Sequence, residues 1–238
     1  RLPQRPLSPL YEQLQLHGCT LSLQGHNPLD CRGNLCGGNY QLPGNVSSQF
    51  VSGLLFALPL LKEKSTLQLT GKVESLPYIR MTLQALEQTG IYIRQREQSF
   101  EIGGNQSYQA PEDCTVEGDW SNAAFWLCAG ALQGAGICCN GLRADSLQGD
   151  RQVLSLLKQF GAQVEQTEDA CSVAPALLHG IEIDAGNIPD LVPILSVVAC
   201  AAQGQTRIYN AGRLRIKESD RLQTVYEVLR ALGAELQM

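Results

Sequence analysis

The chain of 238 residues is 44% hydrophobic and 17% charged and has a formal net charge of −5. Such a chain can bury a core as one large domain or two small ones, and its composition argues against intrinsic disorder. We find no apolar run long enough for a membrane span and no recognisable secretory signal. The net acidity argues against nucleic acid as the main partner, because phosphate binding normally requires a basic surface.

Helices and strands are predicted to alternate along the chain after a proline-rich start. Three apolar helices are predicted at residues 47–61, 121–134 and 190–204. Each leads to a short strand, predicted at 65–71, 135–141 and 205–212. A polar loop and an amphipathic helix follow each strand, at 75–90, 147–161 and 218–233, and further strands are predicted at 100–104, 171–174 and 181–186. The alternation predicts an α/β (α+β) architecture, and the apolar helices are expected in domain interiors.

The amphipathic helices belong to an internal repeat. Four segments, LQLHGCTL, LEQTGIYI, LKQFGAQV and LRALGAEL, end alike and contain Gly18, Gly90, Gly161 and Gly233. Each segment is typical of a helix that ends at a glycine C-cap and leads into a strand. The first copy lacks its apolar helix and the last stops soon after its glycine, so we expect the chain to be incomplete at both ends.

A domain boundary is predicted at about residue 113. The segment 107–122 carries turn residues and a new helix start, at which Asp119 and Ser121 offer N-cap oxygens. The boundary divides the chain into residues 1–113 and 114–238.

The cysteines are irregularly spaced, with no C-x-x-C pair among them, and few histidines could join them in a metal site. We therefore expect neither a zinc site nor a disulfide framework. Most lie in apolar stretches, such as Cys128 in FWLCAGAL and Cys200 in VVACAAQG. These surroundings indicate reduced thiols buried in the core of a cytosolic protein. A reactive Cys138–Cys139 pair is the alternative.

Polar residues gather where predicted strands end and helices begin, which is where α/β proteins place functional groups. In GNVSSQF, Ser47, Ser48 and Gln49 open an apolar helix, where backbone N–H groups and hydroxyls form an anion site or simply a cap. In GKVESLPY, Ser75 and Tyr78 open the next helix, again with capping as the alternative.

The last repeat carries the most charge at this position. Six charges occur in Arg213–Arg221 (RLRIKESDR), either as a solvated helix start or as basic groups that hold an anion beside a carboxylate. Asp190 opens the preceding apolar helix, where a carboxylate can serve the helix dipole alone. Arg1 and Arg5 flank the proline-rich start and by themselves indicate little.

Six motifs together resemble one family: GNVSSQF, SLPYI, QSYQAPEDCTVEGDWSNAAFWL, NGLRADSLQGD, IPDLVP and RIKESDRL. From Arg1 to Met238 the chain resembles the 5-enolpyruvylshikimate-3-phosphate synthase family (EPSP synthase, 3-phosphoshikimate 1-carboxyvinyltransferase). The resemblance implies two domains of repeated βαβαββ units with buried helices, the inside-out barrel of enolpyruvyl transferases. Residues 1–113 would form the later part of the first domain and 114–238 the earlier part of the second. Family motifs that would precede Arg1 and follow Met238 are absent, so we expect a central fragment with little or no activity alone.

The family transfers the enolpyruvyl group of phosphoenolpyruvate to the 5-hydroxyl of shikimate 3-phosphate and releases phosphate, with no metal and no organic cofactor. The resemblance implies that shikimate 3-phosphate contacts Ser47, Ser48, Gln49, Ser75, Tyr78, Asp190 and Lys217. It implies that phosphoenolpyruvate contacts Arg1, Gln49 and Arg221. Of the catalytic groups, Asp190 and Lys217 would hold the reacting hydroxyl, and one of them would draw off its proton. Glu218 would mediate proton transfer at the methylene carbon.

Two alternatives remain. UDP-N-acetylglucosamine enolpyruvyl transferase shares the fold and chemistry, but RIKESDR and the lack of a candidate Cys on a Gly-rich loop argue against it. A non-catalytic ligand-binding remnant is the other. From the resemblance we expect small-molecule substrates, no nucleic-acid or membrane partner, a monomer for the complete enzyme, and a cytoplasmic location.

Overall fold

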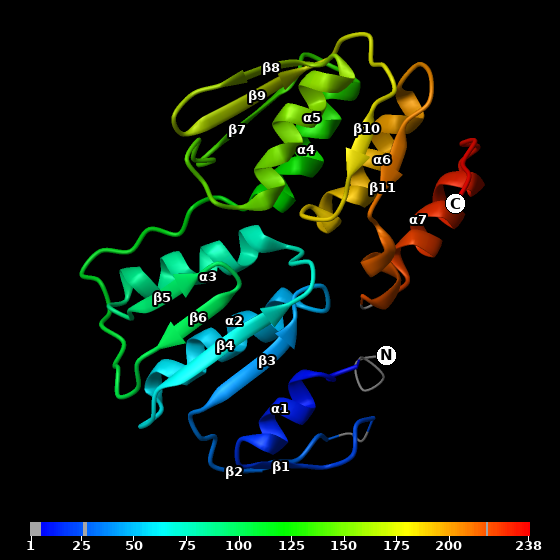
Figure 1. Ribbon diagram of the computed structural model, residues 1–238. Coiled ribbons are helices and arrows are strands. Elements are labelled where there is room, and N and C mark those ends of the chain that lie inside the picture. Colours follow the sequence, from blue (N-terminus) through cyan, green and yellow to red (C-terminus); the bar gives the residue numbers. More distant parts are fainter. Residues whose placement is uncertain (1–5, 26–27, 218) are drawn as a thin grey trace. The chain divides into compact units, whose positions relative to one another are not determined.

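A computed structural model describes residues 6–25, 28–217 and 219–238 of the chain. The chain divides into two units, Arg1–Cys114 and Thr115–Met238, whose helices and strands are labelled in Figure 1. Each unit has its own hydrophobic core. Because residues 1–5, 26–27 and 218 lie outside the described part, Arg1, Arg5 and Glu218 have no structural account.

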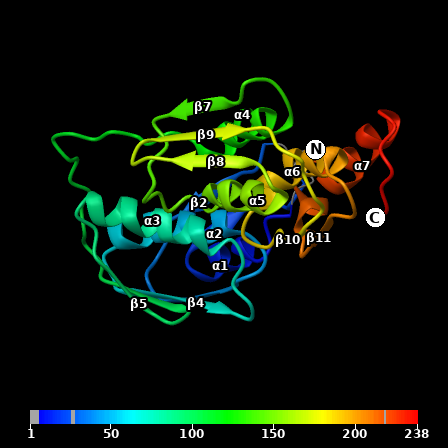
Figure 2. The same cartoon turned by 90° about the horizontal axis from the view of Figure 1, so that it is seen from above.

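The first unit contains a four-stranded sheet in the order β3-β4-β6-β5. Strands β3 (Asn39–Pro43) and β4 (Ser65–Thr70) are parallel, and β6 (Ser99–Ile102) runs antiparallel to β4 and to β5 (Ile93–Arg96). Helices α2 (Ser48–Ala57) and α3 (Leu76–Gln88) cover one face, as Figure 2 shows. Alternate residues of the strands, such as Tyr40, Leu67 and Phe100, point into the core beneath these helices.

The segments β3, α2, β4, α3, β5 and β6 follow one another as a complete βαβαββ unit. The predicted α/β class is thereby confirmed. The 3-10 helix η2 (Leu58–Leu60) ends α2. Ahead of this unit lie α1 (Leu10–Leu16) and a small antiparallel ribbon formed by β1 (Cys19–Leu21) and β2 (Cys31–Gly33).

The second unit repeats the pattern with smaller sheets. Its first part consists of α4 (Trp120–Leu132), β7 (Ile137–Asn140), η3 (Gly149–Gln152), α5 (Val153–Phe160), β8 (Gln163–Gln166) and β9 (Ala170–Ala174). The three strands form an antiparallel sheet in the order β7-β9-β8. Its second part consists of β10 (Glu182–Asp184), η4 (Pro189–Leu191), α6 (Val192–Ala201), β11 (Arg207–Tyr209), η5 (Gly212–Ile216) and α7 (Arg221–Ala231). Strands β10 and β11 are parallel.

The predicted glycine caps are confirmed. Gly18, Gly90, Gly161 and Gly233 follow α1, α3, α5 and α7, with φ angles of 97°, 77°, 108° and 95°. A side chain at these left-handed angles would clash with its own backbone, which is why glycine ends each repeat. Strands follow the first three glycines, but no strand is assigned to residues 234–238.

Two expectations about burial are wrong. Only Cys128 and Cys171 of the cysteines are buried; Cys19 and Cys139 are half-buried, and Cys31, Cys36, Cys114, Cys138 and Cys200 are exposed. The apolar helices are also not buried on all sides, since Phe125 and Trp126 of α4 are 50% and 63% exposed. A helix offers one face to its own core, so an apolar residue on the opposite face is buried only if another element covers it.

Among the described residues, none of the helices combines the length and apolar character that crossing a bilayer requires.

Candidate functional site

Two loops of the first unit meet at one edge of its sheet. Parallel strands end at the same edge, so the segments that follow β3 and β4 emerge side by side. The Gly44 N–H donates to the Thr70 carbonyl at 2.9 Å, and the Glu74 N–H donates to the Gly44 carbonyl at 3.0 Å. A Cβ on Gly44 would lie 2.8 Å from Val73 Cγ2, so only glycine permits this approach.

Ser47, Ser48 and Gln49 lie on the first of these loops and the first turn of α2. Ser47 is the N-cap residue, with φ −155° and ψ 119°, but its side chain makes no capping hydrogen bond. Ser47 is half-buried at the positive end of an apolar helix. The simple capping interpretation of Ser47 therefore fails, and the arrangement suits an anion at the helix start.

Ser75 and Tyr78 lie on the second loop and the first turn of α3. Ser75 is 2% exposed and has left-handed backbone angles, φ 55° and ψ 35°. A buried non-glycine residue in this region stores strain of about 1–2 kcal/mol, and such strain is typical of functional sites. The Ser52 and Thr82 hydroxyls lie 2.7 Å apart and link α2 to α3, and Thr82 Oγ1 donates to the Tyr78 carbonyl at 2.9 Å.

Asp190 and Arg221 come together in the second unit. Asp190 lies in η4 after β10, and Arg221 opens α7, which follows β11 and η5. Strands β10 and β11 are parallel, so the segments that follow them leave the same edge of their own sheet, as the segments after β3 and β4 do in the first unit. An ion pair joins Arg221 Nη1 to Asp190 Oδ1, and both side chains are about a third exposed, at 28% and 32%.

The remaining charges of this loop have different roles. Asp220 caps α7 by accepting from the Gln223 N–H at 3.0 Å, and it pairs with Arg215 at 3.2 Å. The Gln223 N–H first, and then Arg215, lower the pKa of Asp220. Lys217 is half-buried at the end of η5. Asp220 and Arg215 thus stabilise the helix start, and Arg221 reaches the carboxylate on the neighbouring loop.

Asp150 is the residue that the sequence did not single out. It is 2% exposed, and it accepts a hydrogen bond from the Ser121 hydroxyl at the start of α4. Its Oδ1 has no hydrogen-bond partner in the described part of the chain. Burial first, and then the carboxylates of Asp190 and Asp119, raise the pKa of Asp150 to about 6 despite the hydrogen bond from Ser121. A buried carboxyl with a raised pKa close to Asp190 is typical of a functional site.

Little in the local sequence points to Asp150. In LQGDRQV it is followed by an arginine and resembles an ordinary solvated loop residue. Its burial results from the packing of η3 against α4, which lies about thirty residues earlier in the chain. The predicted caps of α4 are half right, since Asp119 accepts from the Ser121 and Asn122 N–H groups at 2.8 and 3.2 Å, whereas the Ser121 hydroxyl binds Asp150.

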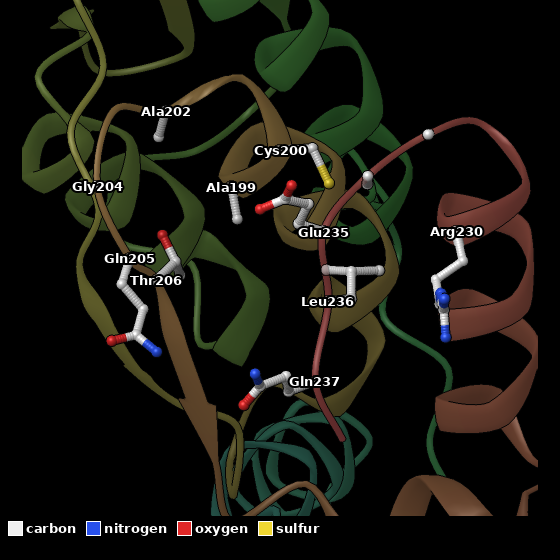
Figure 3. A pocket seen from close by; sticks show the side chains of 12 residues that line it. Ala199, Cys200, Ala202, Gly204, Gln205, Thr206, Arg230, Glu235, Leu236 and Gln237 are labelled. Atoms are coloured by element: carbon white, nitrogen blue, oxygen red, sulfur yellow. The ribbon is translucent and has the colours of Figure 1, made fainter.

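A further cavity of the second unit lies away from these loops. A cavity of about 870 Å³ is lined by the end of α6, the segment before β11, α7 and the tail after it (Figure 3). Cys200, Thr206, Arg230 and Glu235 line it, and none of the predicted site residues does. Arg230 and Glu235 are its charged lining residues, whereas the residues singled out in the sequence lie on the loops described above. In the described residues, no group of three or more His, Cys, Asp or Glu side chains is arranged to hold a metal ion.

Comparisons with known proteins agree on one family. The family model described as "EPSP synthase (3-phosphoshikimate 1-carboxyvinyltransferase)" matches residues 1–238. A curated 3-phosphoshikimate 1-carboxyvinyltransferase from Clostridium kluyveri is 44% identical over 238 residues, which are 99% of this chain and 55% of that protein. The chain thus spans about half the length of the curated relatives it matches.

Two solved structures share the fold. The EPSP synthase from Acinetobacter baumannii has a TM-score of 0.71 and 24% identity, over 96% of this chain and 54% of that one. The enolpyruvyl transferase NikO from Streptomyces tendae has a TM-score of 0.63 and 19% identity, over 84% of this chain and 49% of that one. Both likenesses concern the fold alone, because the identities are low.

Proposed function

The chain belongs to the EPSP synthase family, and from that membership we propose that it supplies the central half of a 3-phosphoshikimate 1-carboxyvinyltransferase. The proposed reaction transfers the enolpyruvyl group of phosphoenolpyruvate to the 5-hydroxyl of shikimate 3-phosphate. Residues 1–113 are proposed as the later part of the first enolpyruvyl transferase domain and 114–238 as the earlier part of the second.

The first unit is proposed to bind shikimate 3-phosphate. One observation carries this proposal: the loops with Ser47 and Ser75 are hydrogen-bonded to each other at the starts of two helices. Hydroxyls and backbone N–H groups at helix starts bind phosphate well, because the donors converge and the helix dipoles favour an anion. The 3-phosphate would contact Ser47 and Ser75, and Ser48 would contact shikimate 3-phosphate in the same site. Tyr78 would line the pocket, and Gln49 would contact both substrates.

The second unit is proposed to supply the reacting groups. Carbon–oxygen bond formation requires that the 5-hydroxyl lose its proton and that the methylene carbon of phosphoenolpyruvate gain one. Asp190 and Lys217 would hold the hydroxyl, and one of them would take its proton. Glu218, which lies outside the described residues, would mediate proton transfer at the methylene carbon. Phosphate then leaves from the carbon that is bonded to the new oxygen, and the neighbouring methyl carbon loses a proton. The double bond between these two carbons is thereby restored.

Arg221 is proposed to bind an anionic group of phosphoenolpyruvate, together with Arg1. The ion pair between Arg221 and Asp190 supports a coupling between substrate binding and proton transfer. An anion that competes for the guanidinium would weaken this pair. The Asp190 carboxylate would then be better able to accept the hydroxyl proton.

Calorimetry with shikimate 3-phosphate tests the proposed binding site. The chain should bind this ligand, and Ser75→Ala should weaken binding at least about tenfold, as expected for loss of a hydrogen bond to a charged group. Ser155→Ala is the matched control, because Ser155 Oγ donates to the Gln152 carbonyl in the second unit. Absence of binding by the unaltered chain would overturn the proposed site. Turnover by the chain alone would exclude a non-catalytic remnant. The monomeric state and cytoplasmic location remain predictions.

A further inference from the structure

Two cysteines of the second unit lie directly opposite each other on adjacent strands. In the antiparallel pairing of β7 and β9, Cys139 is in register with Cys171, and Cys138 is in register with Ser172. Opposed residues of an antiparallel pair have Cα atoms about 4.5–5.5 Å apart, and a disulfide needs about 4.4–6.8 Å. The backbone spacing at this pair therefore suits a disulfide, although both thiols are free.

The two thiols also share a face of the sheet. Cys171 is 1% exposed and belongs to the core, and Cys139 is half-buried and packs against the same core. Cys138 is exposed on the opposite face, and its Sγ lies 3.8 Å from Asn140 Oδ1. Successive side chains of a strand alternate between faces, so the structure separates the adjacent cysteines considered in the sequence and gives Cys139 a different partner.

We propose that Cys139 and Cys171 form a latent thiol pair, which a low-molecular-weight disulfide converts into a cross-strand disulfide. The Cys139 thiolate, the more accessible of the two, attacks the disulfide RSSR, forms a mixed disulfide and releases one RS⁻. The Cys171 thiolate then attacks the Cys139 sulfur and releases the second RS⁻. The two protein thiols are oxidised, RSSR is reduced to two thiols, and the two protons pass to the released thiolates or to water.

The surroundings of the pair make this reaction slow at neutral pH. Burial first, and then the neighbouring thiol of Cys138, raise the pKa of Cys139. Burial first, and then Cys139 and Cys138, raise the pKa of Cys171, and Arg151 acts in the opposite direction. Because the thiolate is the attacking species, the rate should rise about tenfold for each pH unit below these pKa values.

Oxidised glutathione is the probe for this proposal, applied to the folded chain at pH 8.5. After the remaining thiols are blocked, peptide mapping should recover Cys139 joined to Cys171, with two hydrogens lost. Cys138 should carry a glutathione adduct, because the residue in register with it on β9 is Ser172 and not a cysteine. In a Cys138→Ser chain the cross-link should still form. It should raise the melting temperature by about 10 °C, since it closes a loop of roughly 30 residues, and dithiothreitol should reverse the rise.

Single substitutions distinguish the pair from general thiol oxidation. In Cys171→Ser, Cys139 should accumulate as the glutathione adduct and the rise in melting temperature should vanish. If Cys171→Ser fails to fold, the half-buried position can be changed instead, and Cys139→Ser should leave Cys171 as a free thiol. Three results in the unaltered chain would each overturn the proposal. Cys139 could be recovered as the glutathione adduct, as a free thiol while Cys138 is fully modified, or joined to Cys138.

Discussion

At the scale of single residues, the site departs from what local sequence favours. Ser75 holds a left-handed backbone angle that suits glycine. Asp150 is a buried carboxyl, and one of its oxygens has no hydrogen-bond partner among the described residues. Each departure carries a free-energy cost that the rest of its unit must offset. Both residues lie beside groups proposed to handle substrate, which is where such costs are commonly found.

Asp150 should make the stability of the second unit depend on pH. Its pKa is raised to about 6 in the folded chain, whereas an unfolded Asp titrates near 4. The fold therefore favours the protonated form, so the stabilisation is complete below about pH 4 and is lost as the pH rises through 6. The loss should be on the order of 3 kcal/mol between these limits, and Asp150→Asn should abolish most of it.

Urea unfolding followed by tryptophan fluorescence measures this effect. Both tryptophans of the chain, Trp120 and Trp126, lie in α4, so the signal reports on the second unit. Asp145→Asn is the matched control, because Asp145 is exposed and the hydrogen bond from Arg143 lowers its pKa. A pH slope that persists in Asp150→Asn would contradict the assignment.

At the scale of elements, the glycine that ends each amphipathic helix determines how the chain leaves it. The four glycines share a left-handed angle but not the same surroundings. A Cβ on Gly161 would lie 2.8 Å from the Leu177 carbonyl oxygen. Apart from its chain neighbours, no described residue has an atom within 4 Å of a Cβ on Gly233. Position in the repeat therefore predicts the backbone angle, and packing determines how much a substitution costs.

Substituting these two glycines should separate the two effects. Gly233→Ala should cost about 1 kcal/mol for the left-handed angle alone, and Gly161→Ala about 2–4 kcal/mol because the methyl group also meets the Leu177 carbonyl. Asn tolerates the left-handed region, so Gly233→Asn should be nearly neutral while Gly161→Asn stays costly. Both positions lie in the second unit, where tryptophan fluorescence in urea gives the comparison. Equal losses at the two positions would be inconsistent with this interpretation.

The same contrast explains how far sequence could reach. Hydrophobic periodicity and the turn and capping residues are local features of the sequence. They therefore predict the helices, the glycines that end them and the loops that carry Ser47 and Ser75. Burial depends on neighbours distant in the chain. Local sequence therefore predicted a buried position for thiols that are exposed, such as Cys200. It also did not identify Asp150, whose environment depends on α4 and on Asp190.

At the scale of the whole chain, the described residues form a separate hydrophobic core within each unit. The core of the first unit runs from Tyr40 to Ile102 in sequence, and the large core of the second runs from Trp120 to Val198. A region with its own core can unfold on its own. Family membership extends across both units, so binding groups and reacting groups are proposed to lie in regions with separate cores.

Independent unfolding of the two units can be tested by truncating one core at a time. Leu55 and Leu127 are both 0% exposed, in the first and second core respectively. Leu55→Ala should lower the free energy of unfolding of the first unit by about 2–5 kcal/mol. In circular dichroism, the part of the transition that belongs to the first unit should shift to a urea midpoint lower by about 1–2 M. The tryptophan transition, which reports on α4, should stay in place. Leu127→Ala is the reciprocal control and should lower the tryptophan transition by a similar amount. If Leu55→Ala moved both signals together, the two cores would form one cooperative unit, because the loss of a side chain in one would then have destabilised the other.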